Sequence, residues 1–152
     1  MKPRNAVRLD RTIGPAVYVL HRWVYDLSRG LVGHRSGSGP VLLLTTTGRR
    51  TRRRRTKPLL YMPLEDGRLA VVASNGGRDK TPDWWHNLTA DPQVEVRVGR
   101  RRFGARAELL DADSRQPLWP RLTSFYKGWA HYETLTRRRA GVAVLTPSAE
   151  SP

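Results

Sequence analysis

Residues 93–107 read QVEVRVGRRRFGARA, and this stretch decides the fold. Valine occupies every second position from Val94 to Val98, and after the turn Gly99-Arg100-Arg101 the alternation resumes at Phe103 and continues to Ala107. Strict alternation on both sides of a glycine-containing turn predicts a β-hairpin with one buried face. We therefore expect an antiparallel sheet at the centre of the fold.

Segments on either side of this hairpin predict more strands and a few helices. Further strands are expected at 41–47, 58–62, 68–73 and 141–145, and helical stretches at 82–90 and 114–135. Glu65-Asp66-Gly67 is typical of the turn in a second hairpin. About six mostly antiparallel strands with flanking helices predict an α+β fold built on a closed or partly closed barrel.

The N-terminal region has a different pattern. Apolar residues recur at steps of three and four between Thr12 and Leu31, which predicts an amphipathic helix. One interpretation is a helix that packs on the domain, and the other is a helix that lies on a membrane surface, supported by Trp23 and flanking arginines. We divide the chain into this N-terminal amphipathic helix and loop, 1–37, and a barrel domain, 38–148.

Composition restricts the function. The 152 residues contain 28 Lys and Arg against 13 Asp and Glu, a formal charge of +15, which favours nucleic acid, anionic lipid or a polyacidic small molecule as partner. The chain has no cysteine, so thiol chemistry and Cys-ligated metals are excluded, and redox chemistry requires a bound cofactor. No apolar run approaches the roughly 20 residues that span a bilayer. We expect a cytoplasmic protein, with peripheral contact at the inner face of the plasma membrane as an option.

Residues 48–57, GRRTRRRRTK, hold seven cations between two predicted strands. Guanidinium groups are forked donors that suit phosphate and carboxylate, so a cluster of them on one turn favours a multiply charged anion. Two other interpretations remain open from these residues alone, a solvated charge run and a general nucleic-acid surface.

Three further groups are candidates for a site. The glycines at 76 and 77 follow a strand and permit close approach of a ligand, or simply make a turn. Trp84, Trp85, His86 and Asn87 suit the wall of a planar pocket, although core packing is the alternative for the tryptophans. Tyr126, Trp129 and Tyr132 share one helix face, either over a flat substrate or in the core. The four histidines have no metal-ligand spacing, and no serine has an adjacent base.

Several ordered motifs, spread over about 41–147, resemble the deazaflavin-dependent nitroreductase family of actinobacterial split-barrel enzymes, which use the 8-hydroxy-5-deazaflavin coenzyme F-420. The motifs are LTTTGRRT at 44–51, RTKPLLY at 55–61, VVASNGG at 71–77, PDWWHNL at 82–88, ADP at 90–92 and VAVLTP at 142–147. The resemblance implies a split β-barrel and transfer of a hydride from the reduced coenzyme to an electrophilic acceptor, such as a quinone or a nitroaromatic compound.

The resemblance also implies roles for individual residues. The phosphate and acidic tail of the coenzyme would be held by Arg50, Thr51 and Arg55. The deazaflavin and its linker would be lined by Ala73, Ser74, Asn75, Gly76, Gly77, Trp84, Trp85 and Asn87. The substrate would be surrounded by Tyr61, Tyr126, Trp129 and Tyr132, with Ser74, Tyr126 and Tyr132 as the catalytic groups that donate a hydrogen bond or proton.

The chain departs from the family pattern at two places. Arg52-Arg53-Arg54 replaces a Gly-x-Pro-like turn, and Trp129 stands where a tyrosine is usual, so no proton can come from that position. Two alternatives to the deazaflavin reductase are kept: a basic barrel that binds nucleic acid, and a split barrel that uses FMN or haem. If the protein is a deazaflavin-dependent reductase, we expect no specific nucleic-acid partner.

Overall fold

The computed structural model describes residues 35–36 and 39–149 of the chain. Its strands are β1 (Arg35–Ser36), β2 (Gly39–Thr47), β3 (Arg54–Pro63), β4 (Leu69–Val72), β5 (Gln93–Val98), β6 (Arg101–Leu109) and β7 (Val142–Pro147). Its helical segments are the short 3-10 turn η1 (Asn75–Gly77), α2 (Asp83–Ala90), α3 (Ala112–Phe125) and α4 (Lys127–Glu133). The predicted N-terminal helix lies outside the described residues, so it and the boundary of the 1–37 segment stay predictions.

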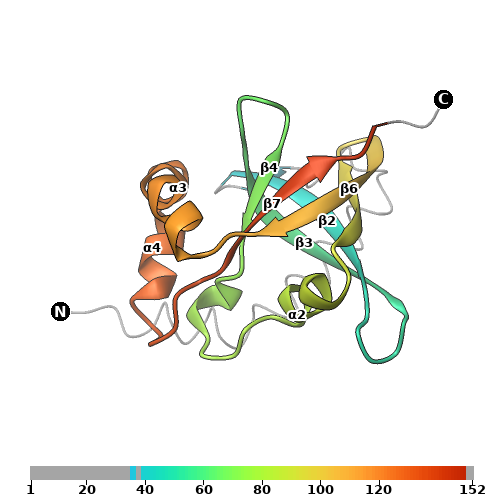
Figure 1. Ribbon diagram of the computed structural model, residues 1–152. Helices are drawn as coiled ribbons and strands as arrows, with labels where there is room; N and C mark the ends of the chain where they lie inside the picture. Colours follow the sequence, from blue (N-terminus) through green and yellow to red (C-terminus); the bar gives the residue numbers. More distant parts are fainter. Residues whose placement is uncertain (1–34, 37–38, 150–152) are drawn as a thin grey trace.

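Six strands of the described chain close into an antiparallel barrel, which confirms the predicted fold class (Figure 1). The strand order is β2-β3-β4-β7-β6-β5, and β5 pairs back onto β2. The hairpin that decided the fold forms as expected, with Val94 opposite Ala105 and Val96 opposite Phe103. Gly99, at φ 59, makes its two-residue turn with Arg100.

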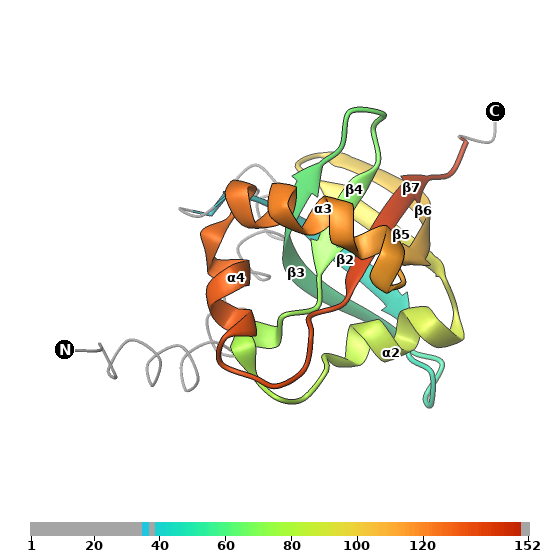
Figure 2. The same ribbon diagram turned by 60° about the vertical axis from the view of Figure 1, so that its left-hand side comes forward.

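The alternating residues separate two cores. One fills the barrel, and its fully buried members include Leu42, Leu44, Val71, Val96 and Leu145. The other lies outside the barrel, where Met62, Val72 and Val142 pack against Leu122 of α3 and Trp129 of α4. Figure 2 shows α3 and α4 together on one side of the barrel and α2 at one end.

Three element boundaries described below differ from the sequence expectation. Strand β3 begins at Arg54 rather than at Pro58, because Arg54, Arg55 and Thr56 pair with the last residues of β2. The Thr45 and Thr56 hydroxyls lie 2.8 Å apart across this pair. The predicted helical stretch 114–135 is interrupted at Tyr126, whose extended backbone (φ −138, ψ 104) separates α3 from α4. Helix α3 begins early, at Ala112, because the Asp111 side chain accepts a hydrogen bond from the Ser114 N–H.

Candidate functional site

Three segments gather at one end of the barrel: the β2–β3 turn (48–53), the loop 73–82 that contains η1, and helix α2 (Figures 1 and 2). These segments hold almost all of the residues predicted for the coenzyme. Arg55 belongs to the same end, because its cross-strand partner is Thr46 and paired residues share a face of the sheet. The structure therefore brings the predicted coenzyme residues together.

The β2–β3 turn has a fixed backbone. The Gly48 N–H donates to the Arg53 carbonyl at 2.7 Å, and the Arg52 N–H donates back to the Gly48 carbonyl at 2.8 Å. A Cβ on Gly48 would lie 2.9 Å from the Thr51 hydroxyl and 3.0 Å from the Arg53 carbonyl, so a larger residue there would force the turn to shift. Arg52 takes the left-handed region, at φ 61. The triple arginine at 52–54 is thus built into a tight turn and the start of a strand.

Most of the cations in 48–57 are exposed and without an acidic partner. In the described part of the chain, only Arg49 and Arg54 of this segment form ion pairs, with Asp83 and Glu95 respectively. Arg50, Thr51 and Arg55 are exposed. Arginines whose donors are not engaged by the protein are available for an anionic ligand.

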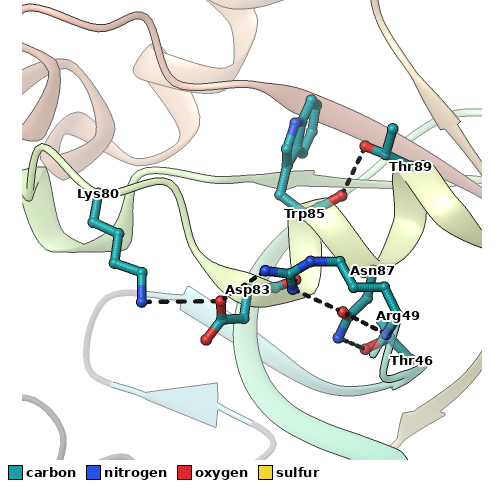
Figure 3. A network of polar contacts seen from close by, with 7 residues as sticks. All are labelled: Thr46, Arg49, Lys80, Asp83, Trp85, Asn87 and Thr89. Carbon is teal, nitrogen blue, oxygen red and sulfur yellow. Dashed lines mark hydrogen bonds and ion pairs between the residues drawn. The ribbon is translucent and has the colours of Figure 1, made fainter. Parts of the chain in front are cut away.

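Asn87 joins α2 to the turn, as Figure 3 shows. Its amide oxygen accepts from the backbone N–H of Arg49 at 3.2 Å and from the Arg49 guanidinium at 3.1 Å. Its amide nitrogen donates to the Thr46 hydroxyl at 3.1 Å. Both Asn87 and Thr46 are buried. Sequence reasoning placed Asn87 beside the ligand; in the structure its side chain fixes the backbone from which Arg50 and Thr51 project.

The two tryptophans of α2 occupy different environments. Trp84 is buried in the barrel core, and Trp85 meets it edge to face, with ring centroids 6.0 Å apart. Trp85 is half-buried and lies against Gly141, where an added Cβ would approach its ring to 2.5 Å. His86 is exposed. Trp84 thus follows the core-packing alternative, and Trp85 keeps an accessible edge.

The loop after β4 has an unusual backbone. Asn75, Gly76 and Gly77 all take positive φ, at 47, 64 and 78. An added Cβ on Gly77 would lie 2.9 Å from both the Tyr132 carbonyl and the Leu135 side chain, whereas none on Gly76 would meet any atom within 4 Å. Within the described residues, the Ser74 hydroxyl and the Asn75 and Gly76 N–H groups have no hydrogen-bond acceptor or donor in the protein. The open side of this loop therefore presents unused polar groups.

Arg138, which sequence reasoning missed, holds this loop. Its guanidinium donates to the carbonyls of Ala73 at 2.9 Å, Ser74 at 3.0 Å, Arg78 at 3.1 Å and Lys80 at 3.4 Å. Removal from water lowers the pKa of Arg138 from its ordinary value, although Asp79 and Glu133 oppose this shift. No sequence signal distinguishes it from its neighbours in the run RRR at 137–139.

The predicted substrate residues lie on two faces of β3. Tyr126, Trp129 and Tyr132 cluster on the outer core; Tyr126 meets Trp129 edge to face at 5.3 Å, and the two tyrosine hydroxyls lie 3.4 Å apart. Tyr61 packs instead with the barrel interior. Neighbouring residues of a strand point to opposite faces, so Tyr61 is separated from the aromatic trio by the sheet.

Other chemistries find no support in the described residues. No group of three or more His, Cys, Asp or Glu side chains there is placed to hold a metal ion. Among the same residues no helix combines the length and apolar character needed to span a bilayer.

Comparison with known proteins gives consistent matches over most of the chain. A family model described as F420H(2)-dependent quinone reductase matches residues 17–147. A curated F420H(2)-dependent quinone reductase of Mycobacterium tuberculosis is 38% identical over 144 residues, which cover 91% of this chain and 95% of that protein. Among solved structures, an F420-H2 dependent reductase is 34% identical, with a TM-score of 0.62 over 70% of this chain and 93% of that one. A structure described as a domain-swapped dimer is 32% identical, with a TM-score of 0.64 over 86% and 98% of the two chains.

Proposed function

The chain belongs to the F420H(2)-dependent quinone reductase family, and on this premise we propose how its residues hold the coenzyme and the acceptor. Membership makes it an oxidoreductase that transfers a hydride from the reduced deazaflavin coenzyme F-420 to an electrophilic acceptor of the quinone type. We extend the acceptors to nitroaromatic compounds, which are also electrophilic.

The residues at the barrel end fit the coenzyme. A deazaflavin coenzyme combines a planar ring with a phosphate and an acidic tail, and it needs cations at one end and neutral polar groups at the other. The turn supplies exposed Arg50 and the adjoining start of β3 supplies exposed Arg55, and neither has an acidic partner among the described residues. The loop 73–77 supplies the unused Ser74 hydroxyl and backbone N–H groups. This pairing of free cations with orphaned neutral donors is the observation that supports the proposal most.

We assign the two segments accordingly. Arg50, Thr51 and Arg55 bind the phosphate and acidic tail, and the loop 73–77 with Trp85 lines the ring and its linker. Trp84 and Asn87 act from the core side, by fixing α2 and the turn. When bound, the reduced coenzyme supplies the hydride; the protein orients it, excludes water and stabilises charge on the acceptor.

The acceptor needs a proton as well as the hydride. A quinone that takes up a hydride becomes an anion on oxygen, and one proton then completes the quinol. Ser74, Tyr126 and Tyr132 are the hydroxyls that we assign to stabilise this charge, whereas Trp129 is buried and has no hydroxyl. Tyr61 packs with the barrel interior on the other face of β3, so we leave it out of the acceptor site.

Quinones with long apolar tails reside in membranes, and the charge of +15 favours an anionic membrane surface. We therefore propose that the protein works in the cytoplasm with peripheral contact at the inner face of the plasma membrane. Binding of the full chain to anionic vesicles, compared with neutral vesicles of equal size, checks this location.

The reaction itself is tested with the purified protein, the reduced coenzyme and menadione as the quinone. We expect Ser74→Ala combined with Tyr132→Phe to lower hydride transfer by tenfold or more, because two hydroxyl donors are lost. Ser124→Ala, which removes an exposed hydroxyl of α3, is the matched control and should leave the rate unchanged. Equal rates for the double variant and the unchanged protein would refute the assignment of the acceptor side.

A further inference from the structure

The loop 73–80 differs from an ordinary surface loop because one side chain binds several of its carbonyl groups. Four of its carbonyls, at residues 73, 74, 78 and 80, accept hydrogen bonds from the single guanidinium of Arg138. The Asn75 side chain also donates to the Lys80 carbonyl at 2.8 Å. These bonds hold the carbonyl groups of the loop on the side that faces Arg138. The N–H groups of Asn75 and Gly76, which bind no acceptor among the described residues, are left for a ligand on the other side.

Inside the loop, the Gly77 N–H donates to the Ser74 carbonyl and the Arg78 N–H to the Asn75 carbonyl, and two local bonds leave a segment with adjacent glycines much of its freedom. Left-handed conformations are unfavourable for a residue with a Cβ, and the two glycines have the widest conformational freedom of any residue. Ordering each residue also costs conformational entropy. A set of four hydrogen bonds from one rigid group selects a single conformation from this range, because the bonds form together only when all four carbonyls are in place.

Arg138 is itself fixed by a second arginine. Arg115 of α3 donates to the Ala140 carbonyl at 2.9 Å and pairs with the Glu133 carboxylate at 2.7 Å. These two contacts lie on either side of Arg138 in the connection from α4 to β7. The Arg115 guanidinium also lies over the Trp119 ring, at 3.9 Å. Arg115 therefore anchors the chain on both sides of Arg138, and this fixes the position from which Arg138 extends to the loop.

We propose that Arg138 is a positioning residue for the coenzyme: by binding four carbonyls of the loop 73–80, it shapes the loop that receives the deazaflavin ring. The inference rests on the proposed function, because it takes this loop as the binding site of the ring. Arg138 does not bind the acidic tail; its donors are directed at the protein backbone, unlike those of Arg50 and Arg55.

The planar fork is what qualifies arginine for this role. A guanidinium presents five N–H donors in a fixed plane, whereas a lysine ammonium is a compact point charge with three rotatable donors. Arg138→Lys keeps the charge and loses the fork, and Arg138→Met loses both while preserving much of the apolar stem. Arg139→Met removes the same charge from an exposed neighbour and is the matched control.

The experiment measures binding of the oxidised deazaflavin coenzyme by fluorescence, together with amide hydrogen exchange across the chain. For Arg138→Met we expect the Kd to rise at least tenfold and exchange to accelerate within 73–80, while the hairpin 93–109 keeps its protection. Arg138→Lys should give an intermediate rise. Arg139→Met should stay within twofold of the unchanged protein and leave exchange in 73–80 as it is.

The outcomes distinguish a failure of the positioning role of Arg138 from a failure of the proposed function. Binding by the unchanged protein together with equal binding by Arg138→Met would overturn the inference and leave the proposed function standing. Absence of binding by the unchanged protein would overturn the proposed function, and the inference with it. If Arg138→Met fails to fold, Arg138→Lys decides: a folded Arg138→Lys protein with unchanged Kd and unchanged exchange in 73–80 would overturn the role of the fork.

Discussion

The β2–β3 turn and the loop 73–80 lie at the same end of the barrel, yet they use arginine in opposite ways (Figures 1 and 2). The backbone of the turn is closed by its own hydrogen bonds and by Asn87, and both Arg50 of the turn and Arg55 at the start of β3 stay exposed. In the loop, the backbone contains two adjacent glycines, and the Arg138 guanidinium donates its hydrogen bonds to the loop carbonyls rather than to a ligand. The comparison teaches that a cation near a site serves either the ligand or the chain, and that its hydrogen-bond partners tell which.

The largest effect is expected where the loop meets α4. Gly77→Ala forces a Cβ into a left-handed residue and against the Tyr132 carbonyl 2.9 Å away, and should lower the free energy of unfolding by about 3 kcal/mol. Gly76→Ala has a similar φ but open space, and should cost only about 1 kcal/mol. Urea unfolding of both variants checks this; equal losses would show that close packing on α4 does not fix the loop.

The next effect belongs to the turn. Asn87→Ala leaves the buried Thr46 hydroxyl and the Arg49 N–H without their partner and should lower the free energy of unfolding by about 2 kcal/mol. Thr89→Ala, on the same helix but exposed, should change it by less than about 0.5 kcal/mol. If Asn87→Ala were as stable as Thr89→Ala, the turn would not depend on α2.

Removal of the free cations should affect binding rather than stability. Arg50→Ala combined with Arg55→Ala should weaken coenzyme binding about tenfold, because charge-assisted hydrogen bonds to the tail are lost, with little change in Tm. Arg100→Ala combined with Arg101→Ala removes equal charge at the far end of the barrel and should change the Kd by less than about twofold. Equal weakening by both pairs would indicate attraction by overall charge alone.

The smallest effect concerns α3, the helix that carries Arg115. The Ser114 N–H holds the pKa of Asp111 below its ordinary value of 3.8. A lowered pKa means that Asp111 stabilises the fold above that value, and that this stabilisation disappears as the pH falls through the folded pKa. Asp111→Ala should therefore lower Tm slightly near neutral pH and not in strong acid. A difference in Tm that is independent of pH would contradict the capping role.

The barrel was predictable from sequence because its signals are local. Alternation of apolar residues in 93–107 determines which face of the hairpin is buried, the apolar and β-branched run at 41–47 indicates a strand, and the glycine at 99 marks the turn. The start of β3 was predicted too late, because an arginine-rich segment does not resemble a strand until β2 is there to pair with it. The break between α3 and α4 at Tyr126 was also not predicted, because the helical spacing of the aromatic residues continues across it.

The candidate site was predictable only in part. The free cations follow from charge density in 48–57, and the polar loop follows from the motif at 71–77. Arg138 could not be found in this way, because its role depends on four carbonyls that lie about sixty residues earlier in the chain. The separation of Tyr61 from Tyr126 and Tyr132 depends on which face of β3 the helices α3 and α4 cover, and the sequence pattern does not show that. The residue roles and the N-terminal helix stay predictions.

We propose that this end of the barrel binds the deazaflavin coenzyme through free arginines on one segment and a shaped neutral loop on the other. The measurement that tests it most directly is a fluorescence titration of the purified protein with the oxidised coenzyme, at low and physiological salt, with FMN as competitor. We predict saturable binding that persists at physiological salt and that FMN does not displace. Absence of binding, or binding that modest salt abolishes, would contradict the claim and reduce the arginine cluster to a general anion-binding surface.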